Sequence, residues 1–287
     1  MEIRDLKIFQ TVANTKSITD AAKKLNYVQS NVTARIQQLE KELSISLFHR
    51  HKRGIILTNE GQRFLQKVNL LLVEFEEIRT MFLNNTEPTG TLNIGTVDTA
   101  HPLPMILATY HKKYPQVQLS LKTDVTKNLL MDVIEYRLDG AFVTGPIQHP
   151  LLKQYVVSTK KLVLVSNRSH FTTNDLINQN FLVFNTGCGY RAVLEKWLKD
   201  ENIINNKFME FNMLEMILHS VALGLGLAIL PESSLTFFSN IGNIYCHEIP
   251  EQYGRITTVF IRNNKITLSQ PTKSFLETVQ LFQPDFL

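Results

Sequence analysis

Hydroxyl groups, glycines and an arginine gather at three places where a strand is expected to pass into a helix. These places are residues 96–99, Thr126 and residues 186–191. The N-terminus of a helix offers unpaired backbone N–H groups and partial positive charge, so each place could hold a carboxylate or another anion of a small molecule. Plain N-capping by the same Thr and Asp side chains is the alternative interpretation.

Two charged side chains in this set act in opposite directions. Arg191 could form a bidentate pair with an acid, whereas Asp98 would repel one unless Arg191 or an amine on the ligand offsets its charge. The pattern therefore favours a small carboxylate or an amino-acid-like molecule, bound in a cleft. The candidate residues for binding it are Thr96, Val97, Asp98, Thr99, Thr126, Phe142, Thr186, Gly187, Cys188, Tyr190 and Arg191.

Catalytic chemistry has weaker support. The eight histidines lack metal-ligand spacing, and the chain has neither a phosphate-binding Gly-rich loop before a Lys nor a Gly-x-Ser-x-Gly segment. Cys188 could be a nucleophile or a redox-sensing thiol at a helix start, but a packed or pocket-lining thiol is the default. The only other cysteine, Cys246, is too distant in sequence for a disulfide framework or a paired-cysteine zinc site. We expect no catalytic residue, no metal and no cofactor.

Length and charge indicate separate tasks for separate parts of the chain. With 287 residues, of which 44% are apolar, the protein is folded and has two or three parts. Residues 1–60 hold ten Lys and Arg against six Asp and Glu, whereas the remaining 227 residues hold twenty of each. The excess positive charge predicts a polyanion partner for the first part. The N-terminus is charged, and the longest apolar run, residues 221–230, is too short to span a membrane, so neither export nor membrane insertion is indicated. The low cysteine content fits the cytoplasm.

The first 43 residues are expected to form three helices. Apolar spacing predicts a helix that ends near residue 15, and Ser17 to Asp20 have the form of a capping box that opens a second one. A third helix is expected over residues 29–43. Its face opposite the apolar stripe is polar with short side chains, which suits the major groove of DNA, although an ordinary solvated face of a bundle is the alternative.

A basic hairpin is expected next. In residues 47–58, two apolar runs flank a Gly-containing turn whose tip would carry His49, Arg50, His51, Lys52 and Arg53, in reach of phosphates or the minor groove. Together with the third helix this hairpin predicts a winged helix-turn-helix domain over residues 1–60. The candidate DNA-binding residues are Gln29, Ser30, Asn31, Thr33, Ala34, Arg35, Gln37, Arg50, Lys52 and Arg53.

A long helix, capped by Thr58 or Asn59, is expected to follow. Its apolar residues are spaced alternately four and three apart, which is typical of a paired-helix seam. We expect pairing with a second subunit, and packing within the same chain is the alternative. A linker that contains this helix and a hinge is assigned to residues 61–86. The predicted dimerisation residues are Phe64, Val68, Leu71, Phe75, Ile78 and Phe82.

The rest of the chain is expected to form a two-lobed α/β body. Residues 91–143 alternate as βαβαβ, typical of a parallel doubly wound sheet with ligands at strand C-terminal ends. A similar unit is expected to begin at residues 162–165. Lobe I is assigned to residues 87–161 and 267–287, and lobe II to residues 162–266.

The head also resembles the LysR-type transcriptional regulators. The resemblance rests on Ala21-Ala22, Leu25, Gln29, Ile36, Leu39-Glu40, Leu47-Phe48, Arg50, Leu57-Thr58 and Gly61 in order. The chain departs from the family pattern at Ser30-Asn31, where a proline is common, and at Ala34, where a longer polar residue is often seen.

The resemblance implies DNA contacts at Gln29, Ser30, Thr33, Ala34 and the wing. It also implies a body built like a periplasmic solute-binding protein, with a small-molecule effector between the lobes. The expected partners are double-stranded DNA, the effector, a second subunit that forms a homodimer or further a homotetramer, and RNA polymerase. A small-molecule-binding or enzymatic body, with a head that serves only for association, is the alternative from another class.

Overall fold

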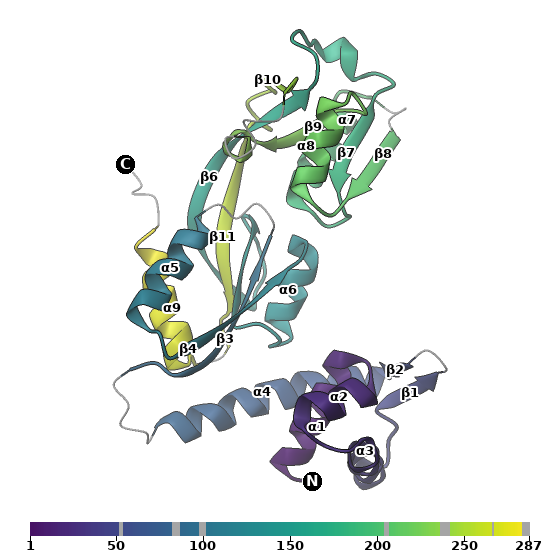
Figure 1. Ribbon diagram of the computed structural model, residues 1–287, viewed down its shortest axis with the longest axis vertical. Helices are drawn as coiled ribbons and strands as arrows, with labels where there is room; N and C mark the ends of the chain where they lie inside the picture. Colours follow the sequence, from purple (N-terminus) through teal and green to yellow (C-terminus); the bar gives the residue numbers. More distant parts are fainter. Residues whose placement is uncertain are drawn as a thin grey trace. The chain divides into compact units, whose positions relative to one another are not determined.

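The computed structural model describes residues 1–51, 54–81, 87–97, 102–203, 207–235, 242–265 and 267–282 (Figure 1). Contacts divide the chain into two compact units, the head, Met1–Thr86, and the body, Glu87–Leu287. The elements of the head are α1 (Ile3–Thr15), α2 (Ile18–Leu25), α3 (Gln29–Leu43), β1 (Phe48–His51), β2 (Gly54–Leu57) and α4 (Asn59–Met81).

Local sequence signals explain the helix ends of the head. Ser17 is the N-cap of α2, and its Oγ accepts a hydrogen bond of 3.2 Å from Asp20 N. Lys16, Asn26 and Ser44 end α1, α2 and α3 in the left-handed conformation. The bounds of α3 match the prediction, and α1 ends where the pattern placed its end.

The wing differs from the prediction in where its strands end. Strands β1 and β2 pair antiparallel from Phe48 opposite Leu57 to His51 opposite Gly54. His49, Arg50 and His51 therefore lie in a strand and not at the tip, because the backbone pairing continues up to Gly54, which has a φ of +135°. Lys52 and Arg53, the other two predicted tip residues, lie outside the described residues.

Helix α4 packs against α1 along part of its length. Thr58 caps it, since Gly61 N donates to Thr58 Oγ1 at 2.9 Å. Gln10 Nε2 donates to Asn69 Oδ1 at 2.8 Å, and the ring of Phe64 lies 5.0 Å from that of Phe9, centroid to centroid. The apolar face of α4 that lies over α1 thus belongs to the core of the head.

This packing divides the predicted dimerisation seam. Val68 is 2% exposed and Phe64 packs on the same core, so these two side chains are used within the chain. Leu71 and Ile78 are 43% and 58% exposed, and Phe75 is partly buried beneath the ammonium of Lys7. Phe82 lies outside the described part of the chain.

The body contains two lobes joined by strands that run between them (Figure 1). In lobe I, β3 pairs parallel with β4 and β5, as predicted, and helices cover both faces of the sheet, α5 and α9 on one side and α6 on the other. The elements of lobe I are β3 (Gly90–Thr96), α5 (Leu103–Lys113), β4 (Val117–Thr123), α6 (Thr126–Ile134), β5 (Gly140–Gly145), the first half of β6 (Leu152–Ser166), β11 (Arg255–Asn263) and α9 (Gln270–Gln280).

Lobe II contains a parallel strand-helix-strand unit, but the unit begins at residue 180 and not at residues 162–165, so the predicted start is wrong. Residues 162–165 form the second half of β6, which pairs antiparallel with β9 and β10. The parallel pair of this lobe is β7 with β8. Its further elements are the short helix η1 (Thr173–Leu176), β7 (Asn180–Phe184), α7 (Gly189–Asp200), β8 (Lys207–Phe211), α8 (Leu214–Ala222), β9 (Ala228–Pro231), the short helix η2 (Glu232–Ser234) and β10 (Tyr245–His247).

The lobe boundary also differs from the assignment of residues 162–266 to lobe II. Strand β11 pairs with β5 and with the first half of β6, so residues 255–263 lie in the sheet of lobe I. The chain therefore crosses between the lobes within β6 and returns before β11. The sheet of lobe I positions the loops that follow β3, β4 and β5, and the β7–β8 pair of lobe II positions the loops that follow these two strands.

Candidate functional site

Helix α3 presents a polar face to solvent. Val32 and Ile36 are fully buried beneath it, while Gln29, Ser30 and Gln37 are exposed on the opposite side. Asn31 and Ala34 are exposed as well, and Thr33 and Arg35 are partly buried. The side chains are short or uncharged near the N-terminus of α3, which is the end that enters the major groove in helix-turn-helix proteins.

Two predicted contact residues at the start of α3 have partners within the head. Gln29 Oε1 accepts a hydrogen bond of 3.2 Å from Thr19 Oγ1 of α2, which orients the Gln29 amide. Thr33 Oγ1 donates to Gln29 O at 3.0 Å. Its hydroxyl hydrogen is used within α3, which leaves the oxygen lone pairs and the methyl group for contacts outside.

Arg35 has a structural contact that its sequence position did not reveal. Its guanidinium Nη1 lies 3.2 Å from Asp5 Oδ1, and the Asp5 side chain is 8% exposed. The other oxygen of Asp5 accepts from Glu2 N at 2.9 Å, at the start of α1. Arg35 thus ties α3 to α1.

Arg35→Ala is expected to destabilise the head by roughly 1–3 kcal/mol, because it leaves the buried Asp5 carboxylate without its cation. Thermal unfolding monitored by circular dichroism measures this change. Lys41→Ala, which removes an exposed cation from the same helix, is the control and should leave the unfolding temperature within error. Equal effects of the two variants would contradict a structural role for Arg35.

The wing adds exposed imidazoles beside α3. His49 and His51 are exposed two residues apart on β1, and their ring centroids lie 6.3 Å apart. Both can donate a hydrogen bond to a phosphate oxygen. The side chains of Arg50, Lys52 and Arg53 lie outside the described residues.

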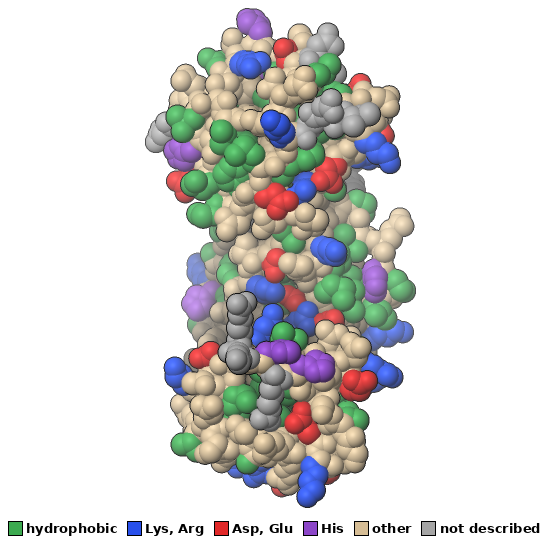
Figure 2. Space-filling model, turned by 90° about the vertical axis from the view of Figure 1, so that its right-hand side faces the viewer, with side chains coloured by type: hydrophobic (Ala, Val, Ile, Leu, Met, Phe, Trp, Pro, Cys, Tyr) green, Lys and Arg blue, Asp and Glu red, His purple; other side chains and the backbone are tan. Residues whose placement is uncertain are grey.

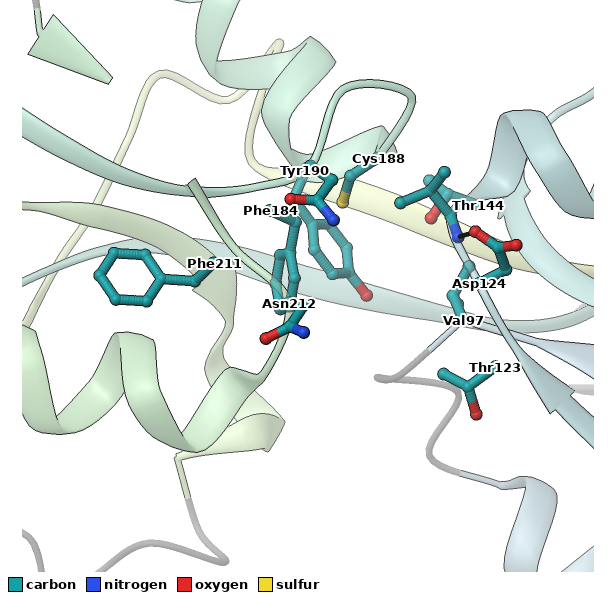
Figure 3. Close-up of a pocket in the computed structure, with 11 residues that line it drawn as sticks. Val97, Thr123, Asp124, Thr144, Phe184, Cys188, Tyr190, Phe211 and Asn212 are labelled. Atoms are coloured by element: carbon teal, nitrogen blue, oxygen red, sulfur yellow. Dashed lines mark hydrogen bonds between the residues drawn. The ribbon is translucent and has the colours of Figure 1, made fainter. Parts of the chain in front are cut away.

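The body contains a cavity of about 200 Å³ between its lobes (Figure 3). Lobe I contributes the ends of β3, β4 and β5, and lobe II contributes the loops that follow β7 and β8. The lining residues are Val97, Thr123, Asp124, Val125, Thr144, Phe184, Asn185, Cys188, Tyr190, Phe211 and Asn212. A cavity of this size and mixed polarity suits a small metabolite.

The structure brings three of the predicted effector residues to this cavity, Val97, Cys188 and Tyr190. Thr126 is buried beside it, and its Oγ1 accepts a hydrogen bond of 3.2 Å from Thr144 N. Thr96 is also buried, and its Oγ1 donates to Val97 O at 2.9 Å. Asp98 and Thr99 lie outside the described residues.

Two other predicted residues are placed away from the cavity lining. Phe142 is fully buried in the core of lobe I, where its ring contacts those of Phe260 and Phe275, so it cannot touch a ligand in the cavity. Arg191 is 13% exposed, and its guanidinium contacts Glu195 at 2.7 Å and Glu210 at 2.5 Å. Because both carboxylates belong to the protein, Arg191 is engaged within lobe II.

One of the two remaining predicted residues makes a contact between the lobes. Gly187, at φ +98°, places its carbonyl oxygen 3.4 Å from Lys127 N at the start of α6. A Cβ on Gly187 would lie 2.9 Å from Lys127 Cβ, so only glycine allows this approach. Thr186, next to it, is exposed.

Most of the lining was missed from the sequence. Thr123 ends β4, and Asp124 and Val125 lie between it and Thr126, the residue that was predicted at this place. Phe211 ends β8 and Asn212 follows it. This strand was not predicted because its residues are exposed or partly buried and show no alternation of burial. Thr144, Phe184 and Asn185 lie at or directly after the C-terminal ends of β5 and β7, and this position could have identified them.

Asp124 is the charged group at the cavity. Its Oδ1 accepts hydrogen bonds of 2.8 Å from Val125 N and Asn128 Nδ2, and its Oδ2 lies 3.3 Å from Lys122 Nζ. Burial alone would raise the pKa of Asp124, but these hydrogen bonds and Lys122 lower it below its ordinary value. The carboxylate is therefore ionised at neutral pH.

Cys188 lies at the N-cap of α7, with its thiol at the cavity (Figure 3). Burial raises the pKa of this thiol, and the backbone N–H groups of Arg191 and Tyr190 and the charge of Arg191 oppose the rise without cancelling it. A raised pKa keeps the thiol protonated, and thus unreactive, at neutral pH. This argues for a pocket-lining thiol and against a redox sensor.

At neutral pH, alkylation of Cys188 by iodoacetamide is expected to be slower than that of a free cysteine, and its rate should still rise with pH where that of a free cysteine levels off, above about pH 8.5. Mass spectrometry of the alkylated peptides gives the rates. Exposed Cys246 is the internal comparison and should react first. Fast modification of Cys188 below pH 8 would contradict the protonated thiol.

Among the described residues, no group of three or more His, Cys, Asp or Glu side chains is placed to hold a metal ion. None of the helices in that part of the chain is long and apolar enough to cross a bilayer.

Comparisons with known proteins agree with a DNA-binding head and a two-lobed body. Residues 3–62 match the family model described as "Bacterial regulatory helix-turn-helix protein, lysR family", and residues 85–282 match the "LysR substrate binding domain". The HTH-type transcriptional regulator CzcR of Bacillus cereus is 52% identical over 280 residues, covering 98% of this chain and 97% of the relative.

Solved structures share the fold. Full-length OxyR from Pseudomonas aeruginosa superposes with a TM-score of 0.72 at 20% identity, covering 98% of this chain and 95% of that one. Full-length CbnR in complex with its target DNA gives 0.64 at 20% identity, covering 98% of this chain and all of that one. The matched families are regulators and not enzymes, which removes the alternative of an enzymatic body. Because both family models match and relatives align along nearly the whole chain, this protein belongs to the LysR family, as a DNA-binding transcriptional regulator with a substrate-binding effector domain.

Proposed function

We propose that this regulator reads its operator through the polar face of α3 and the wing, and that a small molecule in the interlobe cavity controls the outcome. The observation that carries the DNA contact is the face of α3 itself. Ser30, Ala34 and Gln37 are exposed there, while Val32, Ile36 and Leu39 on the opposite side belong to the core of the head. Amide and hydroxyl groups on such a face suit base edges.

For the effector, the cavity lies where the two lobes meet, so a ligand there contacts both. The Gly187 carbonyl and Lys127 N–H already join the lobes at its edge. A ligand that binds one arrangement of the lobes more tightly shifts the population toward it, and by linkage this changes the affinity for DNA.

The functional unit in this proposal is a homodimer in the cytoplasm. Leu71 and Ile78 lie exposed on α4, which leaves an apolar strip for the same helix of a second copy. Two paired heads require an inverted-repeat operator. Phe208, Met213 and Met216, on and beside β8 and α8, are exposed apolar side chains through which dimers can form tetramers. Hydrophobic side chains (green) are exposed over lobe II in the upper part of Figure 2. RNA polymerase is the further partner.

The experiment selects bound genomic fragments with the purified chain and then measures affinity for the selected operator against salt. Gln37→Ala is expected to weaken operator binding by about 1–3 kcal/mol and to relax specificity at one base pair. Ile78→Glu is expected to yield monomers in light scattering and to abolish tight operator binding. Gln66→Ala, an exposed amide on α4 outside the face of α3, is the matched control.

Two results would contradict the proposal. One is unchanged operator affinity in Gln37→Ala together with a salt dependence too weak for phosphate contacts. The other is a wild-type protein that is monomeric in light scattering and still binds its operator tightly.

A further inference from the structure

The charge of the interlobe cavity is negative over the lining that the structure describes. Asp124 is its charged side chain, and the other polar lining groups are hydroxyls, amides and a thiol. Figure 3 shows Asp124 with Val97, Thr123 and Thr144 on one side, and Phe184 and Tyr190 on the other. A ligand between the lobes therefore meets a carboxylate and two aromatic rings.

The cation nearest to Asp124 does not cancel its charge. Lys122 Nζ lies 2.5 Å from Asp132 but 3.3 Å from Asp124, so it belongs mainly to Asp132. Asp132 is also 2.6 Å from Arg137, which pairs in addition with Glu135. Two cations thus face three carboxylates in this cluster, and the excess negative charge lies on the side of Asp124.

An anion bound at the start of α6 would compete with Asp124. The Asp124 carboxylate accepts the Val125 N–H there and occupies the position where the partial positive charge of α6 would attract a ligand anion. Arg191, the predicted partner for an acid, is held by Glu195 and Glu210 and does not line the cavity. A ligand whose only charge is a carboxylate would therefore face Asp124 without a compensating side chain in the described lining.

We propose that the cavity binds an effector that carries a protonated amine, with the ammonium group against Asp124 and the faces of Phe184 and Tyr190. This proposal rests on the proposed function, in which the cavity is the effector site. A carboxylate offers about four lone-pair positions, and Val125, Asn128 and Lys122 use three of them. Phe184 and Tyr190 line the same cavity with their ring centroids 6.2 Å apart, and an aromatic face attracts a cation within about 6 Å of its centroid.

The test uses three probes with the same carbon chain, n-butylammonium, butyrate and 4-aminobutyrate, titrated calorimetrically into the full chain. The two ammonium probes are expected to bind and butyrate is not. Asp124→Asn should weaken n-butylammonium about tenfold or more, as expected for loss of a charged hydrogen-bond partner. Glu277→Gln, an exposed carboxylate on α9, is the matched control and should leave its affinity unchanged.

A second variant covers the case in which Asp124→Asn fails to fold. Phe184→Leu removes one ring but keeps an apolar side chain, and should weaken n-butylammonium by about twofold to fivefold. Any of three results would overturn the amine proposal. Butyrate could bind as tightly as n-butylammonium, the folded variants could keep the wild-type affinity for n-butylammonium, or neither ammonium probe could bind. Operator binding is measured on the same preparations. If the protein still binds its operator, only the amine proposal fails and the proposed function as a DNA-binding regulator stands.

Discussion

Gly61→Ala is expected to disrupt the junction between the wing and α4 and to abolish operator binding. A Cβ at this position would overlap the backbone oxygen of Leu47 and lie 3.0 Å from the carbonyl carbon of the same residue. In a helix with free space, alanine would stabilise by about 1 kcal/mol relative to glycine. Here the obstacle is backbone, which cannot rotate away, so the cost of roughly 3 kcal/mol or more for overpacking reverses the sign.

The neighbouring contacts make this junction stiff. Thr58 Oγ1 donates to Ser46 O at 2.8 Å, and Thr58 N donates to Leu47 O at 3.0 Å. Thermal unfolding and operator binding measure the effect of Gly61→Ala, and Gln62→Ala, at the next and exposed position, is the control. An unfolding temperature at or above that of the wild type would show that α4 does not approach Leu47 this closely.

The helices of the head could be predicted because their signals are local. The Ser17 N-cap and the apolar stripe of α3 each depend on residues within a few positions of one another. The Asp5–Arg35 pair could not be predicted, since its members are thirty residues apart and only the crossing of α1 and α3 brings them together. Gly61 matched the family pattern, but the reason for glycine there is visible only in three dimensions.

The seam of α4 shows how one pattern can serve two purposes. A spacing of four and three residues marks an apolar stripe without saying what covers it. In the structure α1 covers Phe64 and Val68, while Leu71 and Ile78 stay exposed. The stripe was therefore predicted correctly, and packing within the same chain, the alternative, accounts for Phe64 and Val68. Pairing of the exposed part with a second subunit stays a prediction.

In the body, prediction failed where strands lack a buried face of their own. The first half of β6 is rich in polar residues and gains its place by pairing with β11, about a hundred positions later in the chain. Strand β8 is held by β7 alone in its sheet. Asn212, which comes just after β8, could not be assigned to the cavity without that strand.

Gly189→Ala is expected to force the lobes apart at the cavity. Gly189 opens α7, and a Cβ there would lie 2.5 Å from Cβ of Thr144 in lobe I and overlap its methyl group. Rotation of the Thr144 side chain cannot move its own Cβ, so the start of α7 must shift away from β5. The shift breaks the 3.4 Å hydrogen bond from Lys127 N to Gly187 O.

Amide hydrogen exchange measures this change within one sample. In Gly189→Ala the Lys127 amide, which bonds across the lobes, should exchange about tenfold faster or more, whereas amides paired within lobe I, such as that of Val143 in β5, should keep their rates. Gly242→Ala, where a Cβ meets open space, is the control variant. Because the head is a separate unit, basal operator binding should persist in Gly189→Ala while the response to the effector is lost. Unchanged protection of Lys127 would show that α7 and β5 have room for the extra methyl group, and that closure of the lobes does not depend on this contact.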